Sequence, residues 1–123
     1  VYGEDGYKYR DRYFGFTPFA GQEAVWKKED GKWEVQWVMN YYGEVHSVGV
    51  PAKKVYSFLR TALSKVTSDI PFRGPFHFQE KNFRYSNKVE MGDIDVFRGV
   101  ETIFYGGREV YRLRYHGGMV LDR

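Results

Sequence analysis

The chain has 123 residues and a formal charge of +3, and 42% of its residues are hydrophobic, 28% charged and 20% aromatic, a composition typical of one globular domain and not of a disordered chain. It contains no cysteine, which excludes a disulfide framework, a thiolate metal site and a cysteine nucleophile. No run of like charge marks a nucleic-acid arm, and no signal peptide or membrane-length apolar stretch is present. We therefore expect a single cytoplasmic domain over residues 1–123, with neither nucleic acid nor a membrane as its partner.

The first third of the chain predicts three β-strands. Residues 7–14 alternate tyrosines with charged side chains, and this period of two is typical of a strand with one wet face. Residues 19–28 and 33–42 predict two more strands. Asp30 and Gly31 lie between them and favour a hairpin, because glycine accepts the positive φ that tight turns require.

The middle of the chain predicts one helix, over about residues 52–66. Val55, Leu59, Ala62 and Val66 form one apolar stripe at helical spacing. Pro51 suits the first turn. Beyond the helix, residues 83–90, 96–105 and 109–116 predict three further strands. The fold class is thus α+β, a βββ-α-βββ antiparallel domain with its helix packed on one curved sheet or on two small sheets.

The two groups of strands resemble one another. Residues 19–26 and 97–104 both read F-x-G-x-E-x-aliphatic-aromatic, residues 7–12 align with 83–88, and residues 40–43 align with 114–117. This order predicts an internal duplication, with repeat units of about 7–45 and 83–120 around the linking helix. A symmetric molecule would require a second helix before residue 1.

Two carboxylates at equivalent positions are the first candidates for a site. Glu23 and Glu101 each share a strand face with apolar neighbours, where a carboxylate is costly unless it is paired or hydrogen-bonded. Asp11 and Asn87 are also equivalent. These four residues predict a central ligand-binding cleft lined by tyrosines. The alternative is structural, with each glutamate bonded to an arginine or to backbone amides at a bulge.

Three more residues are candidates for ligand contact. His116 precedes two glycines at the predicted end of the last strand, and its repeat partner is Tyr42. Arg73 lies in a Pro-Phe-Arg-Gly-Pro segment and could hold an anion or answer a buried glutamate. The three histidines lack metal-ligand spacing, and no cofactor fingerprint is present. We therefore predict no metal and no cofactor.

Several segments together resemble a prokaryotic family known as domain of unknown function 5680, in their order and spacing. They cover nearly the whole chain and comprise residues 13–15, 19–26, 39–43, 58–63, 71–75, 97–101 and 115–118. The resemblance implies this fold and a helix before residue 1, and it brings no established activity or catalytic residue. Members of the family occur alone or joined to helix-turn-helix regulators, and no helix-turn-helix is visible in this chain.

Three hypotheses for function follow from these patterns. The first is a sensor-like module that binds a small molecule or a protein partner, with Glu23 and Glu101 reading polar groups and tyrosines stacking on the ligand. The second is a hydrolase-type enzyme that uses carboxylates with His116. The third is a homodimer or other oligomer formed through a sheet edge or through Trp26 and Phe104.

Overall fold

The computed structural model describes residues 2–4, 6–46, 49–65 and 74–121. They form strands and one helix in the chain order β1 (Tyr2–Glu4), β2 (Tyr7–Gly15), β3 (Phe19–Glu29), β4 (Lys32–Val45), α1 (Ala52–Leu63), β5 (His77–Glu80), β6 (Phe83–Asp93), β7 (Val96–Tyr105) and β8 (Arg108–Met119). The predicted α+β class and all six predicted strands are confirmed. The helix ends at Leu63, and the part predicted beyond residue 65 lies outside the described residues.

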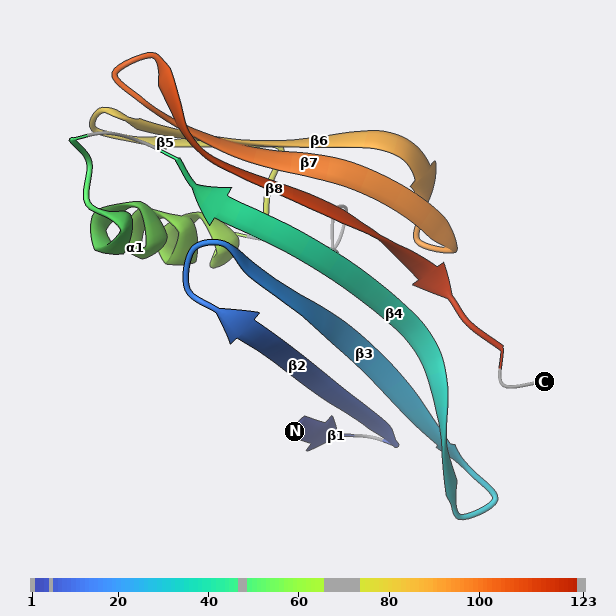
Figure 1. Cartoon of the computed structure of the whole chain (residues 1–123). Coiled ribbons are helices and arrows are strands. Elements are labelled where there is room, and N and C mark those ends of the chain that lie inside the picture. Colours follow the sequence, from blue (N-terminus) through green and yellow to red (C-terminus); the bar gives the residue numbers. More distant parts are fainter. Residues whose placement is uncertain (1, 5, 47–48, 66–73, 122–123) are drawn as a thin grey trace.

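All strands join one antiparallel sheet of eight strands, in the order β1-β2-β3-β4-β8-β7-β6-β5. Of the two predicted arrangements, the single sheet is therefore the one observed. Figure 1 shows the long, twisted strands with α1 lying against one side of them. The strands β1 and β5 were not predicted. Each is a short edge strand of three or four residues, too short to show a period of two.

The two halves of the sheet are built alike around the β4–β8 pair. Tyr41 lies opposite Tyr115 at the centre of that pair. On either side, Gly21 pairs with Tyr41 and Gly99 with Tyr115. The register shifts at Val25/Trp26 in one half and at Ile103/Phe104 in the other, so these two bulges occupy matching positions. A third bulge, at Val89/Met91 between β6 and β7, has no counterpart between β2 and β3. We call β2–β4 the first half and β6–β8 the second half.

The helix α1 covers only part of one face. Its apolar stripe includes Val55, Phe58, Leu59 and Ala62, all buried. The Phe58 ring stacks on Phe78 and Phe83, with centroids 5.6 and 5.0 Å apart, so the stripe is buried mainly against the second half. Burial of such a face, more than intrinsic propensity, holds a helix this short in place.

The face that α1 packs against is here called the inner face. It carries the core, because alternate residues of each strand point to it: Tyr85, Phe97, Ile103, Tyr111, Leu113 and Tyr115 are at most 1% exposed. The opposite, outer face has no helix over it in the described part of the chain (Figure 1). The inner face of the first half extends beyond the helix, and Tyr7, Tyr9 and Tyr13 remain exposed there.

Candidate functional site

Glu101 lies in a buried polar network beneath α1. Its side chain is 0% exposed, and its two carboxylate oxygens accept hydrogen bonds from the Tyr85 hydroxyl and, at 2.7 Å, from the Tyr111 hydroxyl. The Tyr85 hydroxyl in turn accepts the Gly74 amide at 3.1 Å. Such donors compensate the cost of burying a carboxylate. Glu101 is therefore part of the core.

Asn87 belongs to the same buried layer. It is 2% exposed, accepts a hydrogen bond from the Tyr115 hydroxyl at 2.6 Å and donates one to the Gly74 carbonyl at 3.1 Å. Gly99 permits the first of these contacts, because a Cβ at that position would overlap the Tyr115 hydroxyl. Gly99, the glycine of the F-x-G-x-E pattern, thus leaves space for the Tyr115 side chain, which passes over β7 and reaches the Asn87 amide on β6.

The first half repeats this arrangement, and in the described part of the chain Tyr56 of α1 reaches it at Phe16 and Phe19. Tyr41 reaches across Gly21 and donates to Asp11 at 2.5 Å. Tyr9 donates to Glu23 at 2.7 Å. These two hydrogen bonds correspond, position for position, to those of Tyr115 with Asn87 and of Tyr85 with Glu101 in the second half. Here, however, Tyr9 and Asp11 are exposed and Glu23 is only half-buried, so the same pattern faces an open surface.

That surface forms a groove of about 470 Å³. Its walls are mostly apolar and aromatic, with one carboxylate, one amide and one amine among them: Tyr7, Tyr9, Glu23, Val25, Lys27, Gln36, Trp37, Ile94 and Met119. Ligand sites are typically lined in this way, with a few polar groups set among apolar walls. We call these residues the aromatic groove.

One residue of the aromatic groove marks the difference between the halves most clearly. Trp37 pairs with Val25, as Tyr111 pairs with Ile103. Tyr111 donates to the buried carboxylate, whereas Trp37 turns its Nε1 to the Ile94 carbonyl at 3.2 Å. This bond ties the first half to the β6–β7 hairpin. The groove is therefore closed at one end by residues of the second half.

The surroundings of Tyr9 in this groove raise the pKa of its phenol. Burial raises the pKa of Tyr9, and the hydrogen bond to Glu23 and the charge of that carboxylate raise it further. A phenol with a raised pKa remains protonated at neutral pH. Tyr9 thus stays a hydrogen-bond donor to Glu23, and the pair presents an anionic acceptor beside aromatic rings.

The predicted site residues divide between two faces. Glu23 and Asp11 lie side by side on the inner face, as do Glu101 and Asn87, but the structure does not bring the two carboxylates into one cleft. The row of Tyr41 and Tyr115 lies between them. Glu101 accepts hydrogen bonds from two tyrosine hydroxyls, and Asn87 bonds a tyrosine hydroxyl and the Gly74 carbonyl, so both take part in the core. The pairing of each glutamate with an arginine or with bulge amides stays a prediction.

The other three predicted residues do not join this cluster. Tyr42 and His116 alternate with the inward residues Tyr41 and Tyr115, so they point to the outer face, where both are exposed. His116 is also not at the end of its strand, because β8 continues to Met119 through two glycines that pair closely with β4 and β7. Arg73 lies outside the described residues.

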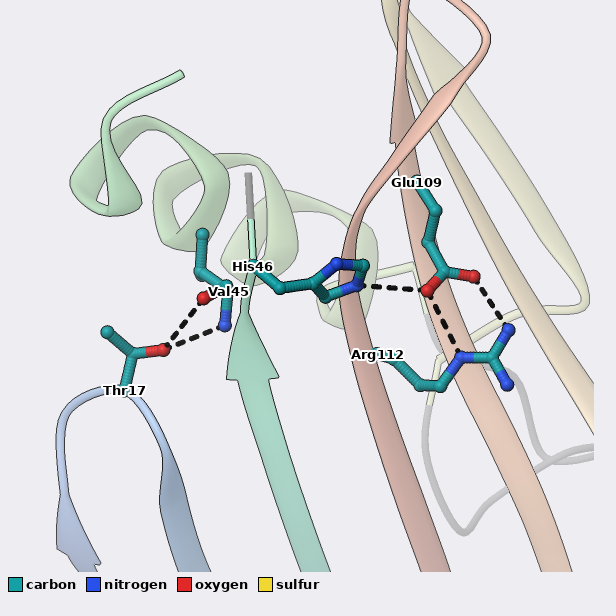
Figure 2. Close-up of polar contacts among 5 residues, drawn as sticks. All are labelled: Thr17, Val45, His46, Glu109 and Arg112. Carbon is teal, nitrogen blue, oxygen red and sulfur yellow. Dashed lines mark hydrogen bonds and ion pairs between the residues drawn. The ribbon is translucent and has the colours of Figure 1, made fainter. Parts of the chain in front are cut away.

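A polar cluster that the sequence did not predict joins the end of β4 to β8 (Figure 2). The Glu109 carboxylate receives Arg112 through two nitrogens, at 2.7 and 3.2 Å, and His46 Nε2 lies 2.9 Å from it. Arg112 and His46 hold the pKa of Glu109 below its ordinary value. Nearby, Thr17 Oγ1 bonds both the amide and the carbonyl of Val45, at 2.8 and 3.3 Å.

This cluster joins the end of β4 to the start of β8. The i,i+3 spacing of Glu109 and Arg112 is unusual for a strand, because alternation would place them on opposite faces. The bulge at Ile103/Phe104 reverses that alternation and lets them meet.

The sequence pattern also did not predict most residues of the aromatic groove, because they come together only in the folded sheet. Tyr7 and Trp37 share a face with Glu23 in the predicted pattern, but Ile94 and Met119 come from elements whose approach only the fold reveals.

Within the described ranges, no group of three or more histidine, aspartate or glutamate side chains could hold a metal ion. No helix in that part of the chain is long and apolar enough to cross a membrane. A family model with the description Domain of unknown function (DUF5680) matches residues 11–120. No curated protein and no solved structure matches the chain.

Proposed function

The chain belongs to the DUF5680 family, and we propose that it is a binding module that takes a small molecule in the aromatic groove of its first half. The observation that carries the proposal is the contrast between the halves. The second half buries its Tyr–Glu pair under α1, and the first half leaves the matching pair in an open, apolar groove. The helix that the repeat predicts before residue 1 stays a prediction.

The lining of the groove indicates the kind of molecule that fits. Tyr7, Tyr9 and Trp37 offer aromatic surface to a flat or apolar body. The Glu23 carboxylate accepts hydrogen bonds and favours a donor or a cation. We therefore propose a small compound with an aromatic or apolar body and an amine, amide or hydroxyl donor.

The proposal is tested with defined probes and a matched control. Benzylamine, phenol and benzoate are titrated into isotope-labelled protein, and the indole Nε1–H signal of Trp37 is followed by NMR. We expect benzylamine to shift this signal with roughly millimolar affinity, as befits a fragment, and benzoate not to shift it. Glu23→Gln should weaken the benzylamine response, whereas Glu44→Gln, which changes an exposed outer-face carboxylate, should not.

Two results would end the proposal. One is a response to none of the three probes together with a native mass spectrum that shows only the bare chain. The other is a response confined to residues outside the groove. A reproducible extra mass in the native spectrum of the purified protein, absent from the denatured one, would support the proposal and begin to name the compound.

We further propose that the two halves arose by duplication of one strand unit. Three equivalences support this origin: the matching bulges, the Gly21–Tyr41 and Gly99–Tyr115 crossings, and the Tyr–Glu pairs. Under this proposal the ancestral pattern was kept in both halves, while the helix came to cover only one. A repeat unit of residues 74–121 that folds and pairs with a second copy of itself would favour this origin. Failure of that unit to associate would count against it.

A further inference from the structure

The outer face of the sheet gathers most of the positive charge of the strands. Because side chains alternate along each strand, cations that are dispersed in the sequence come to one side. The register places these cations on the outer face: Lys8, Arg10, Arg12, Lys28, Arg84, Lys88, Arg98, Arg112 and Arg114, with His116 among them. The carboxylates on or beside the same face are Glu44, Glu90, Asp93 and Glu109.

On strands β6, β7 and β8, three cations of this face lie close together without an ion-pair partner among the described residues. Arg98 lies opposite His116, and Arg114 and Lys88 flank Val100 in the next row. In the chain as described, no carboxylate forms an ion pair with Arg98, Arg114 or Lys88. Glu90 borders the same shallow depression as Arg98, Arg114 and His116, and Asp93 lies on this face two residues beyond Met91, which pairs with Arg98.

Aromatic rings lie between these cations. The Lys8 ammonium lies 5.0 Å from the Trp26 ring centre and the Arg10 guanidinium 5.2 Å from it, and Arg84 lies 4.9 Å over Phe104. Other rings on this face are open to solvent, with Tyr42 57% and Phe14 72% exposed. The register places Phe14, Tyr42, Arg114 and Lys88 in a single row across the sheet.

We propose that the outer face binds single-stranded nucleic acid. Arg98, Arg114 and Lys88 contact the phosphates, and the exposed rings of the same row stack with bases. Single strands are bound in this way, by cations that follow the backbone and by aromatic side chains on an open sheet. A duplex hides its base faces, and an anionic membrane has no planar group for Tyr42, so neither would use the rings between the cations.

The sequence predicts that nucleic acid is not a partner, because no run of like charge is present along the chain. Nothing in the structure tests that prediction, and the arrangement of charge on the outer face favours the opposite. Strand pairing forms a basic cluster that the linear sequence does not show. Residues such as Arg98 and Arg114 are far apart in the chain and become neighbours across β7 and β8. The face is also separate from the aromatic groove, so the two proposals can fail independently.

The test is fluorescence anisotropy with an end-labelled oligo-dT and an oligo-U of about 12 nucleotides, within the site sizes known for single-strand binders. We expect binding at about 20 mM salt that weakens steeply by 200 mM, as counterion release requires. Arg98→Glu with Arg114→Glu should weaken it at least tenfold and flatten the salt dependence. Tyr42→Ala should weaken it by a factor of about 5 and leave the salt slope nearly unchanged.

Two controls make the result specific to this face. Lys53→Glu with Lys54→Glu makes the same change of net charge on the exposed side of α1, and it should alter the affinity less than about twofold. Glu90→Gln removes the carboxylate beside the cluster and should tighten binding. Circular dichroism of each variant verifies that it is folded, so that a loss of binding reports on the face.

Four outcomes overturn the proposal. They are no binding of either oligonucleotide at low salt, an equal loss in the helix control, tighter binding of a duplex of the same length, and binding of vesicles that contain phosphatidylglycerol without binding of oligonucleotides. The last of these would assign the face to an anionic membrane instead.

Discussion

The two halves of the sheet carry two matching tyrosine hydrogen bonds in different surroundings. In the second half, Tyr85 and Tyr111 donate to a glutamate that is fully buried beneath α1. In the first half, Tyr9 donates to Glu23 beside an open groove. A shared local pattern therefore does not fix a shared role. What decides the role is whether another element covers the pattern, because burial turns a polar contact into a structural one.

The largest expected effect comes from the element that distinguishes the halves. Phe58→Ala removes a ring that stacks on Phe78 and Phe83 and should lower the free energy of unfolding by about 3–5 kcal/mol, as aromatic-to-alanine changes in cores do. Tyr7→Ala, in the exposed groove, should cost less than about 1 kcal/mol. Urea denaturation measures both. Equal losses would show that the first half is as tightly packed as the second.

The glycine crossings give a smaller and finer comparison. Gly99→Ala pushes a Cβ against the buried Tyr115 hydroxyl and should destabilise the protein by about 1–3 kcal/mol, the usual cost of overpacking. Gly21→Ala meets Tyr41 and the Arg12 carbonyl in a similar way, but Tyr41 is 7% exposed against 1% for Tyr115 and its partner Asp11 is exposed, so this ring has more room to shift. We expect a clearly smaller loss of stability for Gly21→Ala, again by urea denaturation. A larger loss there would reverse the assignment of open and covered halves.

The smallest effect concerns pH and the His46–Glu109–Arg112 cluster at the start of β8. Arg112 and His46 lower the pKa of Glu109 from its ordinary value of 4.5. A lowered pKa in the folded state contributes stability above about pH 4.5, and that stability is lost as the pH falls through the folded value. The wild type should therefore lose more stability between about pH 5 and 3 than Glu109→Gln, by less than about 1 kcal/mol because the pair is partly exposed. Thermal melts at each pH measure the difference, and parallel losses would show that the cluster contributes nothing.

Much of the fold could be predicted from alternation and helical spacing alone. The strands that were found are long and carry a wet and an apolar face, as in residues 7–14, whereas β1 and β5 are too short to show a pattern. The site was harder to predict. Glu23 and Glu101 have nearly identical neighbours in sequence, and what separates them is the cover over the second half, formed by α1 and by the backbone at Gly74 and Phe76. Ile94 and Met119 reach the groove across the sheet, which no local pattern indicates.

We propose that two equivalent carboxylates have different roles, Glu101 in the core and Glu23 at a surface site. The most direct test is urea unfolding of Glu101→Gln and Glu23→Gln side by side. We predict a loss of about 2–3 kcal/mol for Glu101→Gln, because buried hydrogen bonds to a charged acceptor are weakened. Glu23→Gln should cost less than about 1 kcal/mol, as surface changes usually do. Similar losses in both variants, or a larger loss for Glu23→Gln, would show that the two carboxylates do not differ in their structural role.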